Sequence, residues 1–276
     1  MKIGVVGLGL IGGSVAKAYK AYGNIVYGFD TDSTILGYAK LSGTIDDILT
    51  PERYGECELI VLAATPKAMK AYLEENAAKI PAATTVIDFC GIKEEICNIG
   101  FELAHRHGFT FVGGHPMAGS QYSGFKHSRP TLFKGAPMIV VPPVYDDMEL
   151  LERVKQMLAP LEFKTFVVTT AEHHDRMIAY TSQLCHIVSN AFIKSPASRD
   201  HDGYSAGSFR DLTRVARLNE AMWTELFLNN KKPLLEELDL IINSLQEYRE
   251  ALQQDDAARL CDLLREGRIA KELSEG

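Results

Sequence analysis

The chain has 276 residues, a formal net charge of −7, and 46% hydrophobic against 24% charged residues. This composition is typical of a globular protein and excludes collagen-like, low-complexity and disordered chains. The acidic balance argues against nucleic-acid binding, and no apolar run approaches the ~20 residues that cross a bilayer, so we expect no membrane partner. The N-terminus shows no secretory signal, which predicts a cytoplasmic protein, and the length predicts about two domains.

Short apolar runs rich in Val and Ile predict strands at 3–6, 25–29, 59–63, 85–88, 109–112, 138–141 and 163–168. Several are continuously apolar, as strands buried on both faces are. Helical stretches at 12–22 and 67–79 alternate with the early strands. This order predicts an α/β Rossmann-type, doubly wound, mainly parallel sheet over residues 1–168.

A glycine-rich turn follows the first strand directly and opens the first helix, with the sequence Gly7-Leu8-Gly9-Leu10-Ile11-Gly12. In that context the glycines allow a tight turn, a close approach to a pyrophosphate and packing of the helix on the strand. Asp30 ends the second strand, where a carboxylate can bind the adenosine ribose and repel a 2′-phosphate. We therefore expect NAD in preference to NADP; a plain glycine turn and a turn or N-cap aspartate are the alternatives.

Residues at the carboxyl ends of the strands are expected to border the ligand crevice of an open parallel sheet. Thr65 and Pro66 follow the third strand, Gly91 follows the fourth, and His115 follows the fifth. The imidazole of His115 stands between glycines and a proline, and its pKa suits uptake of an alcohol proton while hydride leaves. His115 is therefore the candidate catalytic residue.

The sequence predicts no metal site and no disulfide framework. The five cysteines are scattered without a C-x-x-C pair. Two histidine pairs, at 105 and 107 and at 173 and 174, lack the spacing that places two ligands on one helix face.

The strand signal stops near Thr170, which predicts an all-α domain over residues 169–276. One of its helices carries a polar stripe that either faces solvent or lines the crevice: Ser182, Gln183, His186, Ser189 and Asn190. A surface ion-pair network is one interpretation of the charged residues Arg210, Asp211 and Arg214. The other is that Arg214 binds a substrate carboxylate through its planar guanidinium group. Further on, an apolar seam with helical spacing fits either an intramolecular core or a dimer interface: Leu234, Leu238, Ile241, Leu245, Tyr248 and Leu252.

Together these segments resemble the prephenate/arogenate dehydrogenase family of tyrosine biosynthesis. The resemblance rests on the opening IGVVGLGLIGGS, on GGHPMAGS around His115, on the stretch from Leu132 to Pro137, on the pair His174-Asp175, and on SFRDLTRVA before Trp223. It implies oxidative decarboxylation with NAD, of prephenate to 4-hydroxyphenylpyruvate or of L-arogenate to tyrosine. It also implies a homodimer formed through the helical domain.

The resemblance assigns His115 to catalysis and five further residues to the substrate site: Arg214, His186, Ser120, Gln121 and Gly207. Three departures accompany it. Gly91 stands where relatives commonly have serine, Gln121 where many have glutamate, and Gln183 where they have histidine. Alternative functions are another small Rossmann dehydrogenase, of the β-hydroxyacid or pyrroline-carboxylate reductase type, and a non-catalytic NAD-binding regulator.

Overall fold

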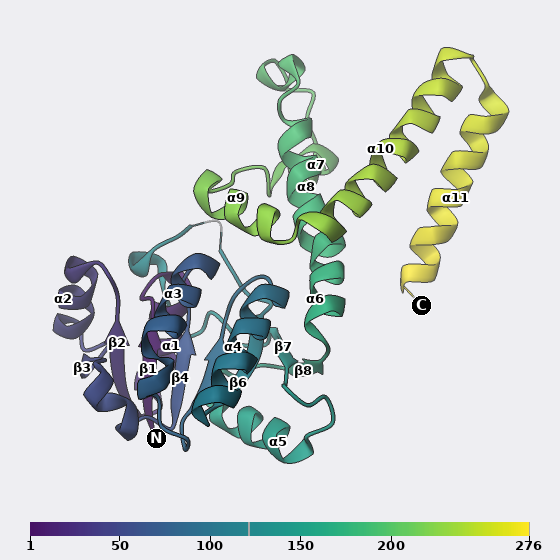
Figure 1. Cartoon of the computed structure of the whole chain (residues 1–276). Coiled ribbons are helices and arrows are strands. Elements are labelled where there is room, and N and C mark those ends of the chain that lie inside the picture. Colours follow the sequence, from purple (N-terminus) through teal and green to yellow (C-terminus); the bar gives the residue numbers. More distant parts are fainter. Residues whose placement is uncertain (121, 276) are drawn as a thin grey trace.

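The computed structural model describes residues 1–120 and 122–275, which form a sheet domain and a helical domain (Figure 1). The sheet has eight strands in the order β3-β2-β1-β4-β5-β6-β7-β8. They are β1 (Lys2–Val6), β2 (Ile25–Phe29), β3 (Asp47–Ile48), β4 (Leu59–Leu62), β5 (Thr85–Asp88), β6 (Thr110–Pro116), β7 (Pro137–Val141) and β8 (Thr165–Val168). Within the described residues, β6 with β7 is the one antiparallel pairing, so the predicted mainly parallel Rossmann sheet is confirmed.

Helices cover both faces of the sheet: α1 (Leu10–Ala21), α2 (Ser33–Leu41), α3 (Pro66–Asn76), α4 (Glu94–His107) and α5 (Met148–Met157). Val15 of α1 and Leu150 of α5 belong to one buried apolar layer, whereas Leu73 of α3 and Ile96 of α4 belong to the other. The continuously apolar strands lie between these layers, which explains why their sequences do not alternate. Short 3-10 turns occupy Pro51–Glu56, Ala77–Lys79, Phe125–His127, Ala159–Leu161 and Pro196–Arg199.

The helical domain begins with a rod made of α6 (Ala171–Ile178), a π-helical segment (Ala179–Leu184) and α7 (Cys185–Phe192). Three helices follow before the C-terminal one: α8 (Gly207–Thr213), α9 (Glu220–Asn229) and α10 (Lys231–Gln253). With α11 (Ala257–Glu275), α10 forms a hairpin that projects away from the rest of the chain (Figure 1). None of the helices in the part of the chain that the structure describes is long and apolar enough to cross a membrane.

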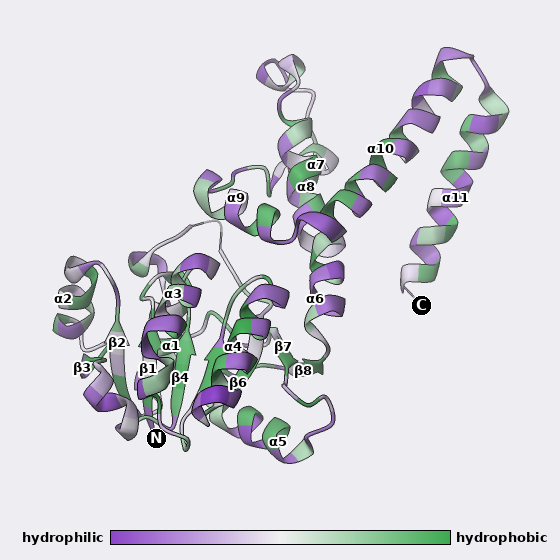
Figure 2. Cartoon of the chain, viewed as in Figure 1, coloured by the Kyte–Doolittle hydropathy of each residue, from purple (hydrophilic) through white to green (hydrophobic). Residues whose placement is uncertain are grey.

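The apolar seam of α10 is buried only where the helix begins. Leu234 is 5% exposed, but Leu245 and Leu252 are 60% and 62% exposed. Apolar residues recur along both helices of the hairpin, as the green segments in Figure 2 show, whereas the connection at its tip is hydrophilic. An intramolecular core therefore does not explain the outer part of the seam.

Candidate active site

The glycine turn between β1 and α1 has the geometry that a bound pyrophosphate needs. Gly7 has a φ of +86°, and a Cβ on Gly12 would lie 1.8 Å from the carbonyl oxygen of Gly7. A Cβ on Gly9, by contrast, would meet nothing within 4 Å. Gly9 caps α1 without a side-chain hydrogen bond, so the first backbone N–H groups of the helix face open space that suits an anion. Leu8 is fully buried, whereas Leu10 and Ile11 are partly exposed.

Asp30 lies directly beyond β2 and braces the glycine turn. Its Oδ2 accepts the backbone N–H of Leu8 at 2.7 Å, and its Oδ1 accepts that of Asp32 at 2.9 Å. A carboxylate has about four acceptor positions, so acceptor capacity remains for ribose hydroxyls. Asp32, not Asp30, is the N-cap of α2.

The other residues expected at the crevice lie at the carboxyl edge of the sheet. Thr65 is the N-cap of α3 and Pro66 begins that helix. Gly91 follows β5, and a Cβ built on it would have Leu226 Cδ2, at 3.8 Å, as its nearest neighbour. Gly91 therefore lies where α9 of the helical domain approaches the sheet.

His115 lies within a strand, which corrects the expectation that the strand ends at residue 112. β6 continues to Pro116 because its second half pairs with antiparallel β7, where His115 is opposite Ile139. Asp88, the last residue of parallel β5, pairs with Gly113. His115 thus lies on β6 two residues past the level at which the neighbouring β5 ends, at the carboxyl edge of the sheet. Backbone pairing with β7, and not a loop, fixes its position.

Sequence patterns alone do not reveal the role of His174, which lies on α6 and contacts the candidate catalytic residue. His115 Nδ1 is 2.8 Å from His174 Nε2, and His174 Nδ1 is 2.6 Å from Asp175 Oδ1. The Asp175 carboxylate also accepts the backbone N–H groups of Lys93, at 2.7 Å, and Glu94, at 2.8 Å, where α4 begins. The only available signal in the sequence is the pair His174-Asp175 itself, which carries part of the family resemblance but has no role assigned to it.

A buried ion pair lies beside these groups. Lys93 Nζ contacts the Asp88 carboxylate, and both side chains are fully buried. Asp88 also accepts the backbone N–H groups of Cys90 and Gly114, at 2.9 and 3.3 Å. Burial alone would lower the pKa of Lys93, but the Asp88 carboxylate raises it, so the ammonium stays charged.

Both histidines are held in the neutral form. Burial, followed by the proximity of His174 and Lys93, keeps the pKa of His115 well below its usual value. Burial also lowers the pKa of His174; the Asp175 hydrogen bond opposes this effect and the charge of Lys93 reinforces it. A neutral His115 can accept a proton, as a base at this position must.

The polar stripe of the rod does not face solvent. Gln183 and Ser189 are buried, and the stripe instead binds backbone carbonyls of the helical domain. Ser189 Oγ donates to Leu212, His186 Nδ1 to Val215 and Asn190 Nδ2 to Ala216, at 2.6, 3.0 and 3.0 Å. These bonds hold the segment that carries Arg214, so the stripe shapes the helical wall.

Arg214 ends α8, is exposed, and has no carboxylate partner among the described residues. Arg210 and Asp211 likewise form no ion pair in the described part of the chain, so of the two alternatives the structure does not support the surface ion-pair network. His186 lies close to Arg214, and its ring contacts that of Trp223 at an angle of 50°, with the ring centroids 4.0 Å apart. Burial lowers the pKa of His186, and the charge of Arg214 lowers it further.

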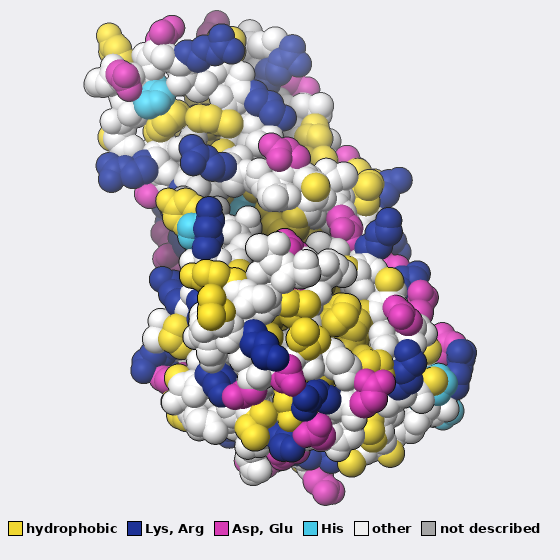
Figure 3. Space-filling view, turned by 90° about the vertical axis from the view of Figure 1, so that its left-hand side faces the viewer, with side chains coloured by type: hydrophobic (Ala, Val, Ile, Leu, Met, Phe, Trp, Pro, Cys, Tyr) yellow, Lys and Arg dark blue, Asp and Glu magenta, His cyan; other side chains and the backbone are white. Residues whose placement is uncertain are grey.

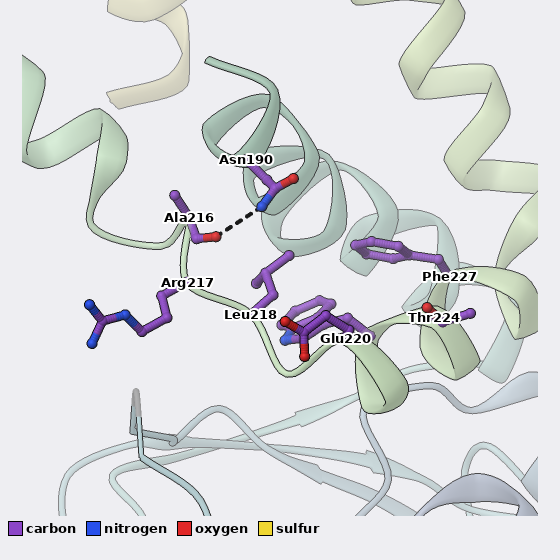
Figure 4. A pocket seen from close by; sticks show the side chains of 8 residues that line it. Asn190, Ala216, Arg217, Leu218, Glu220, Thr224 and Phe227 are labelled. Atoms are coloured by element: carbon purple, nitrogen blue, oxygen red, sulfur yellow. Dashed lines mark hydrogen bonds between the residues drawn. The ribbon is translucent and has the colours of Figure 1, made fainter. Parts of the chain in front are cut away.

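A cavity of about 350 Å³ adjoins this wall, between α7, α9 and the segment that joins α8 to α9. Figure 4 shows Arg217, Leu218 and Glu220 around it and the bond from Asn190 to Ala216. In Figure 3, hydrophobic and histidine side chains are visible at the waist between the two lobes. Among the described residues, neither His186 nor Arg214 forms a hydrogen bond or a ring contact with His115, which belongs to the sheet domain.

Three further residues were assigned to the substrate site. Ser120 follows β6, is exposed, and accepts the backbone N–H of Tyr122 at 3.2 Å. Gly207 is the exposed first residue of α8. Gln121 lies outside the described residues.

The chain combines a Rossmann sheet that carries a glycine turn with a helical domain that contacts His115 at the carboxyl edge of the sheet. These features define the class of two-domain nucleotide-dependent dehydrogenases. Family models narrow this class: residues 15–167 match "Prephenate dehydrogenase, nucleotide-binding domain" and residues 170–266 match "Prephenate dehydrogenase, dimerization domain". The chain belongs to the prephenate dehydrogenase family.

Individual relatives agree over nearly the whole chain. Prephenate dehydrogenase of Bacillus subtilis is 31% identical over 99% of this chain and 75% of its own length. The structure of prephenate dehydrogenase from A. aeolicus in complex with hydroxyphenyl propionate and NAD+ is 25% identical, with a TM-score of 0.83, covering 99% of this chain and 97% of that one. Synechocystis arogenate dehydrogenase is 26% identical, with a TM-score of 0.81, covering 99% of this chain and all of that one.

Proposed function

We propose that the protein catalyses the NAD-dependent oxidative decarboxylation of prephenate to 4-hydroxyphenylpyruvate, with residues 1–168 binding NAD and residues 169–276 binding substrate and forming a homodimer. The observation that carries the proposal is a neutral His115 at the carboxyl edge of the sheet, where helices of the second domain approach. The family match across both halves supports it. The assignment to this family replaces the alternatives of the β-hydroxyacid and pyrroline-carboxylate reductase types.

The sheet domain supplies the cofactor site in this proposal. The open face of Gly9 and the N-terminus of α1 receive the pyrophosphate, and Asp30 receives the adenosine ribose. Asp32 places a second carboxylate beside Asp30, which disfavours the 2′-phosphate of NADP. When bound, NAD accepts a hydride.

The residues of this chain then have separate tasks. His115 accepts the hydroxyl proton while hydride departs from the same carbon. Arg214, unpaired among the described residues, binds a substrate carboxylate, with His186 beside it. Loss of carbon dioxide makes the ring aromatic, which supplies the driving force, so the protein needs mainly to position the reactants.

The decisive experiment measures NADH absorbance after the purified protein is mixed with NAD and either prephenate or L-arogenate. We expect NADH with prephenate, and a lower rate when NADP replaces NAD. If NADH forms with L-arogenate alone, the substrate is the amino acid L-arogenate and not prephenate. If neither compound yields NADH, the proposed dehydrogenase function is rejected. The remaining alternative is then a non-catalytic NAD-binding regulator, and NAD binding measured by calorimetry would support it.

A further inference from the structure

Asp175, His174 and His115 form a continuous hydrogen-bonded line from the helical domain into the sheet domain. The line consists of the bond from Asp175 Oδ1 to His174 Nδ1, 2.6 Å long, and the bond from His174 Nε2 to His115 Nδ1, 2.8 Å long. Asp175 and His174 are each 2% exposed. Water therefore does not compete for these bonds, and each bond needs one donor and one acceptor.

The proton positions follow from the Asp175 end of the line. The Asp175 carboxylate accepts two backbone N–H groups, those of Lys93 and Glu94, at the start of α4. Each carboxylate oxygen accepts one of these N–H groups, Oδ1 from Lys93 and Oδ2 from Glu94, so Asp175 acts as an acceptor at both oxygens. His174 must therefore carry its proton on Nδ1 and donate it to Asp175.

The same reasoning determines which ring nitrogen of His115 carries the proton. His174 is neutral, because burial and the Lys93 ammonium oppose its protonation more than Asp175 favours it. The Nε2 of a neutral ring that is protonated on Nδ1 has only a lone pair to offer. His115 must therefore donate from its own Nδ1, which leaves its Nε2 unprotonated.

We propose that His174 and Asp175 are positioning residues that hold the proton of His115 on Nδ1 and leave Nε2 free to accept the hydroxyl proton of the substrate. This inference rests on the proposed role of His115. The hydroxyl proton passes to Nε2 as hydride leaves the carbon. The same nitrogen returns a proton to that oxygen when carbon dioxide departs, so the imidazole is unchanged over one cycle.

Gly91 supplies no side-chain hydroxyl that could hydrogen-bond His115 from the other side of the site. The resemblance to the family leads one to expect a serine hydroxyl at this position, and glycine cannot provide it. The space that its side chain would enter borders Leu226, an apolar neighbour. Among the side chains of the described residues, only His174 forms a hydrogen bond with His115.

The first test compares three variants of α6 in the full-length protein. His174→Phe removes the acceptor for His115, and we expect kcat to fall about 100-fold with KM for NAD unchanged. His174→Gln keeps an acceptor oxygen and should lose less activity than His174→Phe. The matched control is His173→Gln, which changes the exposed neighbouring histidine and should leave kcat within about twofold.

A merely structural role for His174 predicts the opposite order, because phenylalanine fills a buried site better than glutamine does. Equal kcat in His174→Phe and the unmodified protein would overturn the proposal. So would higher activity in His174→Phe than in His174→Gln.

The second test reads the tautomer directly and needs no substrate. In protein labelled with ¹⁵N-histidine, long-range proton–nitrogen spectra should show the His115 proton on Nδ1, and His174→Phe should move it to Nε2. Asp175→Asn should weaken the same preference. An Nε2 proton on His115 in the unmodified protein would refute the proposal, whereas absence of NADH in the assay above would refute the proposed function and leave the tautomer result intact.

Discussion

His115 is half-buried at the carboxyl edge of the sheet. Burial, and after it the proximity of His174 and Lys93, holds the pKa of His115 well below its usual value. A base with a lowered pKa stays unprotonated at lower pH, so activity is lost only when pH falls through that lowered value. We expect kcat/KM to stay level from about pH 8 through about pH 6.5 and to decline below it. A decline centred above pH 7 would contradict this environment.

His115→Asn should lower kcat by about 10²- to 10⁴-fold and abolish the decline of kcat/KM at low pH.

Arg214 is the residue that we expect to bind the substrate anion, because its guanidinium has no carboxylate partner among the described residues. Losing a charge-assisted bond costs about 1.5–3 kcal/mol, which is roughly a 10- to 150-fold change in binding. Arg214→Ala should therefore raise KM for prephenate by that factor and leave KM for NAD unchanged. Arg217→Ala is the comparison, since Arg217 lines the neighbouring cavity. If only Arg217→Ala raises KM, the carboxylate lies in that cavity.

At the scale of elements, the two domains meet where carboxylates of the helical domain reach the N-termini of two sheet-domain helices. Asp175 accepts N–H groups at the start of α4, and Glu225 of α9 accepts the N–H of Lys67, near the start of α3, at 2.6 Å. Both positions favour negative charge because the helix dipole is positive there. The same contacts bring His174 to His115, so domain docking assembles the base.

We expect Glu225→Gln to weaken this docking by up to about 1 kcal/mol, which lowers Tm by roughly 2–4 °C in a chain of this size. Differential scanning calorimetry measures the change. Glu74→Gln, an exposed carboxylate farther along α3, serves as the control and should not lower Tm. An equal fall in both variants would mean that total charge, and not the helix cap, is responsible.

The sheet could be predicted from the sequence because its strands are short apolar runs bounded by turns. β3 was missed because two residues, Asp47 and Ile48, form no run. The end of β6 was also missed, since glycine and proline have poor strand propensity and only the pairing with β7 keeps that segment extended. The glycine turn and Asp30 were visible because their spacing along the chain is local. The contact between His115 and His174 spans 59 positions and two domains, so no local spacing could reveal it.

At the scale of the whole molecule, the α10–α11 hairpin exposes many apolar side chains that the rest of its own chain does not cover. Exposed apolar side chains along it include Leu235, Ile242, Leu245, Leu252, Leu264 and Leu273. Side chains of this kind typically gain about 1.5–3 kcal/mol each when fully buried. The segment from α6 to the middle of α11 matches the family's dimerization domain, which supports a second copy of the chain as the partner that covers them.

Leu245→Glu should therefore convert the protein from a dimer to a monomer of 30.5 kDa. Leu245 is 60% exposed in the single chain, so the charge leaves the fold of each subunit intact and acts only where a partner would bury it. Sedimentation equilibrium gives the mass, and circular dichroism checks the helix content. Asn243→Glu is the matched control, because two positions along an α-helix place residue 243 about 160° away from residue 245. A protein that keeps twice the monomer mass with Leu245→Glu would show that the seam of α10 lies outside the interface. Loss of activity together with loss of the dimer would show that each site needs the second copy.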